Sequence, residues 1–244
     1  MANPEQVLQE AKRALVSDVG LDLLKRPISI GYDGSALTLE GEVESVAAKK
    51  QALERAALVR GVDGIVDRLR VEPAARMTDA EIQDHLHHAF LGELAFAGFG
   101  IHGFHAGREA VLEPPADAAH DGLFIEVKDG VVTLNGNVPS LDHKRLAGVL
   151  AWWIPGSRDV INGLAVEPLE EDSPEKVEEA VRVALEKDPF IDAAQVRVGV
   201  RNRVVRLTGA LASKEQRNMA EYDAWYVFGV DNVINEINVM PLRA

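Results

Sequence analysis

The sequence has 244 residues, of which 47% are hydrophobic and 27% charged, as in an ordinary globular protein. It has no cysteine, which excludes disulfides, thiol catalysis and thiolate metal sites. No stretch approaches the roughly 20 apolar residues of a membrane span. The N-terminus lacks a basic segment followed by an apolar run, so we expect a cytoplasmic protein, or a periplasmic one if a leader has been removed.

The net charge of −13 is unevenly distributed. Residues 1–75 carry 10 Lys/Arg against 12 Asp/Glu, and residues 173–244 carry 10 against 11. Residues 76–172 carry 6 against 16, a net charge of −10, and hold all seven histidines. The acidity therefore belongs to the middle of the chain, where it bears on solubility and partners rather than on fold.

The first module begins with a helix signal, because Asn3 can cap a helix and Pro4 suits its first position. Asp33-Gly34 is typical of a hairpin turn, and Ser45 can cap a second helix. In chain order we expect a helix from residue 4, strands over 28–30 and 36–39, a helix over about 45–58 and a strand over 62–71.

The central module begins at Thr78-Asp79-Ala80-Glu81, a capping-box sequence that predicts a helix through Phe90. An insertion at about 92–122 separates this helix from a strand over 123–127. We expect part of the insertion to form an extra helical turn and part a loop around Pro114-Pro115. Long connections of this kind are usually functional or mobile.

The third module has the clearest boundaries. Ser173 followed by Pro174 predicts a helix start. A strand then leads to the turn Asn202-Arg203, and Ser213 begins the second helix. The strands are expected at the end of the segment 192–200 and over 233–239.

Three copies of one pattern connect these elements. Each copy starts at a glycine, has a second glycine 20 residues later and a valine 30 residues later. The glycines are Gly41 and Gly61, Gly136 and Gly156, and Gly209 and Gly229. Repeats of this kind predict tandem modules, here of roughly 70 residues each. We place them at 1–74, 77–168 (with the insertion) and 173–244. We predict the α+β class, with each module an αββαβ unit whose three-stranded mixed sheet is packed on one face by two helices.

The repeated motif resembles the BON domain family, named for bacterial osmotically inducible and nodulation-associated proteins. The motif is a strand, Asp-Gly, Val-x-Leu-x-Gly-x-Val, an alanine-bearing helix, Gly-Val-x-x-Val-x-Asn and a final strand. The central copy carries Asp129 to Val138, Gly156 and Val160-Ile161-Asn162. The third carries Gly209, Gly229-Val230 and Val233-Ile234-Asn235 without Asp-Gly, and the first has Asp67 at the asparagine position.

The resemblance implies a binding or attachment module of stress or envelope type, without a catalytic motif and without a cofactor. Several members act at membranes and are proposed to bind phospholipid, and an osmotic-stress role would likewise come from the family. The partners implied are a phospholipid surface or another protein, including a second copy of the chain. Overall acidity and the lack of a basic domain argue against nucleic acid.

Aromatic pairs near the end of the second helix form one candidate contact surface. The pairs are Trp152-Trp153 and Trp225-Tyr226, where the first copy has Ala57-Leu58. Adjacent helical residues point about 100° apart, so both rings of a pair cannot enter one small core. The rings can pack between modules or subunits, widen the core, or meet a membrane interface.

Arginines form a second candidate surface, for anions or lipid headgroups. Arg197, Arg201 and Arg206 are expected on the sheet face opposite the helices, because the alternating valines of the same strands occupy the other face. The alternative is a solvated face with acidic neighbours. The six repeated glycines match no nucleotide-binding motif and are interpreted as structural.

The histidines are weak metal candidates. His102 and His105 lie three residues apart in the insertion, and His85, His87 and His88 lie on the first central helix. A metal- or pH-responsive binder is therefore a further alternative, although spacing i, i+2, i+3 does not place three ligands on one helix face. The leading interpretation is a non-catalytic multi-domain binding or scaffold protein. The first alternative is a self-assembling or protein-interaction module without lipid affinity.

Overall fold

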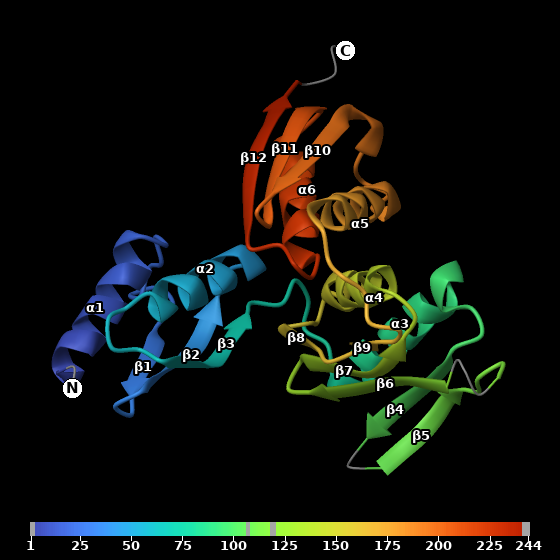
Figure 1. The fold of residues 1–244 in the computed structure, drawn as a ribbon, viewed down its shortest axis with the longest axis horizontal. Helices are drawn as coiled ribbons and strands as arrows, with labels where there is room; N and C mark the ends of the chain where they lie inside the picture. Colours follow the sequence, from blue (N-terminus) through green and yellow to red (C-terminus); the bar gives the residue numbers. More distant parts are fainter. Residues whose placement is uncertain (1–2, 106–107, 118–120, 241–244) are drawn as a thin grey trace. The chain divides into compact units, whose positions relative to one another are not determined.

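The computed structural model describes residues 3–105, 108–117 and 121–240, which form two compact units. The first unit spans Met1–Glu72, and the second spans Pro73–Ala244 and contains both the central and the third module. The predicted α+β class is confirmed, with helices packed on mixed sheets (Figure 1).

The first unit has the predicted order of elements. They are α1 (Pro4–Ser17), β1 (Ile28–Tyr32), β2 (Ala36–Val43), α2 (Val46–Ala57) and β3 (Gly64–Val71). Asn3 and Ser45 cap the two helices by accepting from Glu5 N and Ala48 N. Strand β2 is central, antiparallel to β1 and parallel to β3. The helices cover one face, and a core that includes Leu15 and Leu39 lies between the layers.

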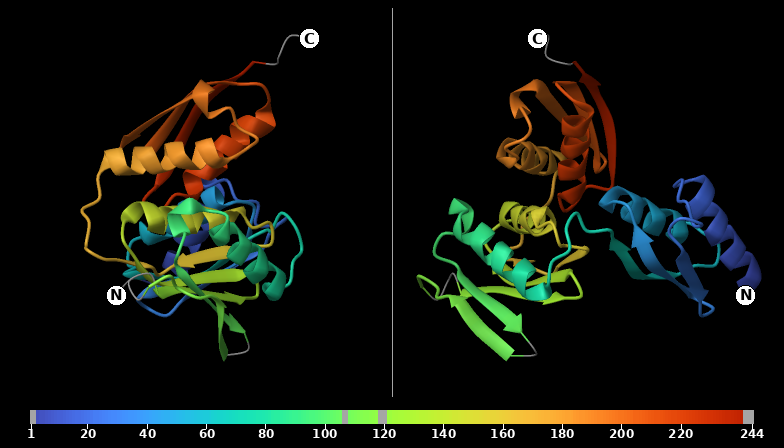
Figure 2. Two further views of the ribbon diagram at one scale, coloured as in Figure 1. Left: turned by 90° about the vertical axis from the view of Figure 1, so that its right-hand side faces the viewer. Right: turned by 180° about the vertical axis from the view of Figure 1, so that it is seen from behind.

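The third module repeats this arrangement. Its elements are α5 (Pro174–Lys187), the 3-10 turn η2 (Ala193–Gln195), β10 (Val196–Arg201), β11 (Val204–Leu211), α6 (Lys214–Tyr226) and β12 (Asn232–Val239). Figure 2 shows the two helices on one face of the sheet, which leaves the opposite face open. Asn202 and Arg203 both adopt positive φ (51° and 62°), the geometry of the tight turn that Asp129-Gly130 makes in the central copy (53° and 76°).

The central module is larger than predicted. Its elements are α3 (Asp79–Leu91), the 3-10 turn η1 (Leu94–Phe96), β4 (Gly100–His105), β5 (Arg108–Glu113), β6 (Asp121–Lys128), β7 (Val131–Val138), α4 (Leu141–Trp153), β8 (Asp159–Asn162) and β9 (Ala165–Val166). Its sheet has six strands, ordered β5-β4-β6-β7-β8 with β9 also pairing β7. The expectation of three strands was therefore wrong here. The insertion contributes the helical turn η1, and its next residues form a β4–β5 hairpin that extends the sheet beyond β6.

The first glycine of each repeat lies where the first strand crosses close to the second. Gly136 and Gly209 have φ of 119° and 128°, and an added Cβ would lie 1.4 Å from the Gly122 oxygen and 2.0 Å from the Gln195 oxygen. No side chain fits in that space. Gly41, Gly61 and Gly229 also have positive φ, whereas Gly156 does not: its Cβ would collide with the side chains of Met77 and Ile82.

The asparagine of the repeated motif joins the second helix to the last strand. In the third module Asn235 donates to the Arg217 carbonyl (2.9 Å) and accepts from Ile237 N (3.1 Å). Asn162 makes the corresponding contacts with Lys144 O and Leu164 N in the central module. In the first module the equivalent Asp67 accepts from Leu69 N and pairs with buried Lys49 at 2.9 Å, so a salt bridge takes the place of the side-chain amide contact.

Candidate functional site

The aromatic pairs meet one another inside the second unit. The ring of Trp152 on α4 stacks on Tyr226 of α6, with centroids 5.7 Å apart and planes at 11°. Trp153 donates from Nε1 to Asp223 Oδ1 at 2.8 Å, and Trp225 is only 1% exposed. Of the three alternatives for these rings, the membrane interface does not hold for Trp225, whose side chain is buried. The other three rings are half-buried where the central and third modules pack together.

Arg145, which the sequence analysis did not single out, also contributes to the contact between the central and third modules. Arg145 on α4 is 1% exposed and donates from Nε to the Phe228 carbonyl (3.0 Å) and from Nη2 to Asp172. Next to it, Lys144 Nζ lies 4.8 Å from the centre of the Phe228 ring. Both cations of the central module thus contact Phe228, just after the second helix of the third module. Arg145 also binds Asp172, in the linker that precedes the third module.

The interface contains a buried carboxyl group with an unusual protonation equilibrium. Asp223 is 3% exposed, and burial raises its pKa to about 8. The hydrogen bond from the Trp153 N–H lowers this pKa by a smaller amount, and the nearby Asp188 carboxyl raises it further. Burial, followed by the charge of Asp223, also raises the pKa of Tyr226. At neutral pH the interface is therefore formed with Asp223 largely protonated.

Between α4 and α5 lies a cavity of about 230 Å³. Its lining is mostly apolar, including Leu146, Val149 and Val183, with Arg145 and Glu179 among the polar residues. A cavity of this size is below the usual range for drug-sized ligands, about 300–1,000 Å³.

The three predicted arginines lie together on the open face of the third sheet. Arg206 on β11 pairs in register with Gly199, which lies between Arg197 and Arg201 on β10. All three arginines are exposed. Diagonal neighbours of this kind are about 7–8 Å apart at Cα, within reach of long side chains. An added Cβ at Gly199 would meet nothing within 4 Å, so the surface between the arginines is open.

Only one of these arginines has an acidic partner within the described part of the chain. Arg206 binds both carboxylate oxygens of Glu236 on β12, at 2.7 and 2.8 Å. Among described residues, Arg197 and Arg201 make no ion pair. The equivalent face of the first module is balanced instead, with Glu40 paired in register with Arg68, and Glu42 with Arg70. The first module therefore lacks the basic face of the third.

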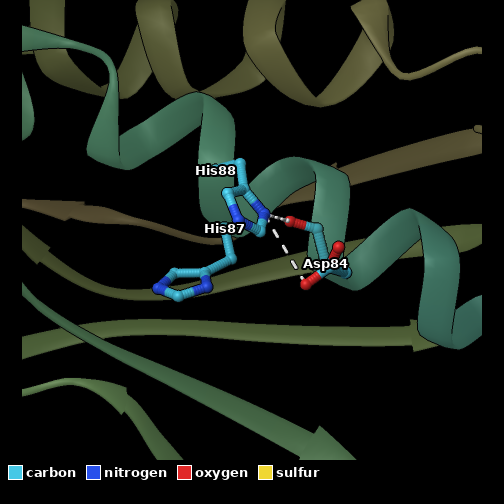
Figure 3. Close-up of side chains that lie close together, drawn as sticks. All are labelled: Asp84, His87 and His88. Atoms are coloured by element: carbon cyan, nitrogen blue, oxygen red, sulfur yellow. Dashed lines mark hydrogen bonds and ion pairs between the residues drawn. The ribbon is translucent and has the colours of Figure 1, made fainter.

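The histidines lie on different elements of the central module, His102 on β4 and His87 and His88 on α3. His102 on β4 is 7% exposed, stacks on Phe124 and lies 2.9 Å from Glu109. His105 lies at the end of β4, and its side chain is outside the described residues. His87 and His88 instead lie close to Asp84 on α3, a residue that the sequence analysis did not single out (Figure 3). The spacing Asp-x-x-His-His, at i, i+3 and i+4, would have identified this cluster.

None of the helices in the described residues is long and apolar enough to cross a membrane. Repeated αββαβ units, each with two helices on one face of a mixed sheet, define a class of small tandem α+β modules. The chain belongs to the BON domain family, whose model matches residues 9–73, 110–168 and 173–241, and the predicted resemblance is confirmed. The second match begins within β5, because the insertion separates α3 from the rest of its module.

Two solved structures of one protein show similarity across nearly the whole chain. One is the C-terminal domain of CdsD, the structural protein of the type III secretion system of Chlamydia trachomatis, at 14% identity over 98% of this chain and 100% of that chain, with a TM-score of 0.25. A second CdsD structure gives 14% identity, 98% and 94% coverage and a TM-score of 0.26. Similarity at this level defines neither a partner nor an activity for this chain. No curated protein matches the sequence.

Proposed function

We propose that the protein is a non-catalytic attachment protein whose third module binds the surface of an anionic phospholipid membrane. The observation that carries the proposal is the cluster of Arg197, Arg201 and Arg206 on one open sheet face of a chain with a net charge of −13. Membership of a family regarded as binding modules, without a catalytic motif, agrees with this reading.

The electrostatics support binding in spite of the overall acidity. The Debye length is about 8–10 Å near physiological ionic strength, so acidic groups farther away than this are largely screened from the face. Each Lys or Arg close to an anionic membrane contributes about 1 kcal/mol. Ile234, which is 37% exposed, lies beside Arg206 in register and adds an apolar side chain to the same face.

Sedimentation with vesicles tests the proposal. The full chain is mixed with phosphatidylcholine vesicles with and without about a third of phosphatidylglycerol, at low and at high salt. We expect binding only to anionic vesicles, loss of binding at high salt, and at least a tenfold weaker affinity for Arg197→Glu/Arg201→Glu, since two attractions of about 1 kcal/mol each become repulsions.

Lys12→Glu/Arg13→Glu is the matched control. Both residues are exposed on α1, and the double change alters the net charge by the same amount. If both double variants weaken binding equally, net charge rather than the arginine face is responsible. If the parent sediments with neither kind of vesicle at low salt, the lipid proposal is wrong and the face is better explained as a contact for an acidic protein.

A further inference from the structure

Helix α3 of the central module carries three potential metal ligands on one side. Asp84, His87 and His88 each offer one donor atom, and these atoms lie within 4.8 Å of one another. The spacing i, i+3, i+4 brings side chains to the same side of a helix. We infer that this cluster, which we call the α3 site, binds a divalent first-row transition metal such as Zn²⁺ or Ni²⁺.

The hydrogen bonding of His88 leaves the correct nitrogen free for a metal. Its Nδ1 lies 2.8 Å from the carbonyl oxygen of Asp84. A carbonyl can only accept, so Nδ1 carries the hydrogen and Nε2 keeps its lone pair. A histidine ligand held by a bond from its other nitrogen to a backbone carbonyl is the usual arrangement at metal sites, because that bond fixes both the tautomer and the ring orientation.

The other two ligands are also oriented by the helix. The Nε2 atom of His87 is buried, so the nitrogen that an ion can reach from solvent is Nδ1. Figure 3 shows the His87 ring beside the pair formed by Asp84 and His88. The Asp84 carboxylate has an oxygen 3.6 Å from His88 Nδ1, and both side chains are about two-thirds exposed (65% and 67%). The Asp84 carboxylate can therefore rotate at little energetic cost, while the bond from Nδ1 holds the His88 ring.

The donor set fits the proposed class of ion. Two imidazole nitrogens and one carboxylate oxygen suit zinc, nickel and copper better than calcium or magnesium, which prefer oxygen ligands. Ligands about 2.0–2.2 Å from a common ion lie about 3.3 Å apart in a tetrahedron. Rotation of the exposed Asp84 carboxylate toward the His88 ring would bring the donor atoms closer to that spacing. With three protein ligands, the ion keeps a coordination position open for water or for a partner's side chain.

The charge around the site favours a cation. Residues 76–172 carry 6 Lys/Arg against 16 Asp/Glu. On α3 itself, Asp79 and Glu81 occupy the first turn. The α3 site lies on a different module from the arginine face, so its metal affinity and vesicle binding can be measured independently.

Titration calorimetry of the full chain with ZnCl₂ and with NiCl₂ tests the inference. We expect one site in the micromolar range, no displacement by millimolar Mg²⁺, and at least a tenfold loss of affinity in Asp84→Asn/His88→Gln and in His87→Gln. His85→Gln, an exposed change on the same helix, is the matched control and should leave affinity unchanged. His102→Gln separates the α3 site from the insertion histidines.

Each outcome decides the question. Absence of binding at about 100 µM metal overturns the inference, as does binding that survives Asp84→Asn/His88→Gln. Equal losses in that variant and in His85→Gln would point to unspecific histidine binding. Because Asp84 and His88 are exposed, their substitution should leave the tryptophan fluorescence of the folded chain unchanged, which distinguishes lost ligands from lost structure.

Discussion

Asp223 should make the stability of the second unit fall as the pH rises. Its carboxyl is buried between α4 and α6, and its pKa is raised from 3.8 to about 8. The folded state therefore holds a proton that the unfolded chain has released. The stabilisation is fully present below about pH 4 and is lost progressively until the pH passes about 8. The slope in that window is roughly 1.4 kcal/mol per pH unit at most.

Between pH 6 and pH 8 this group alone should lower the free energy of unfolding by about 2 kcal/mol. For a unit of this size that corresponds to a fall in Tm of about 4–8 °C. Asp223→Asn keeps an oxygen that accepts from Trp153 and presents N–H groups to Asp188, without an ionisable proton. The variant should match the parent near pH 6 and be the more stable of the two at pH 8.5.

Tryptophan fluorescence is a specific probe for this experiment. The chain has three tryptophans: Trp152 and Trp153 of the central module contact α6 of the third module, and Trp225 is buried on α6 itself. Glu175→Gln is the control, since the pKa of that exposed carboxyl is lowered by the backbone N–H it accepts from, and it stays ionised throughout the range. Parent and Asp223→Asn curves that fall in parallel from pH 6 to pH 8 would refute the assignment of the slope to Asp223.

Two further predictions concern the same unit. Gly209→Ala should destabilise the second unit by at least about 2 kcal/mol in urea unfolding, because φ is 128° and the new Cβ would meet the Gln195 oxygen. The control Gly199→Ala, on the open face, should change stability by less than about 0.5 kcal/mol. Equal effects would show that the crossing does not require glycine. Arg145→Met should lower the free energy of unfolding by about 1–3 kcal/mol, less than for a fully buried ion pair because its partner Asp172 is 41% exposed. It should also split the unfolding of the central and third modules into two transitions. A single unchanged transition would place the coupling elsewhere.

The repeated part of the fold could be predicted because its local signals agree with one another. Capping residues such as Thr78 and Ser173, and glycines at a constant interval, fix helix starts and strand crossings within short stretches of chain. The hairpin β4–β5 could not be predicted, because Arg108–Glu113 shows no alternation and the hairpin joins the sheet only where β4 pairs with the distant strand β6. Its stability comes from pairing with β6, which no local sequence pattern indicates.

The site was predictable only as a set of possible surfaces. The alternation of β10 correctly indicated the face on which Arg197 and Arg201 lie, since strand geometry decides it locally. Whether the Trp152 ring is exposed or packed depends on Tyr226, more than seventy residues away in the sequence. One local signal was available: Asp223 occupies the position that Leu150 holds in the central copy, and a carboxyl in place of a buried leucine points to an interface or a functional site.

The comparison of the three copies also explains how one scaffold acquires different surfaces. The contact between the second helix and the last strand is kept in each module, by Asn162, by Asn235 or by the pair Lys49 and Asp67. What changes lies outside that contact. The positions that hold aromatic pairs on α4 and α6 hold Ala57 and Leu58 in the first module, and Leu58 is 69% exposed. Because the internal contact does not involve these positions, the three modules carry different side chains there on the same αββαβ scaffold.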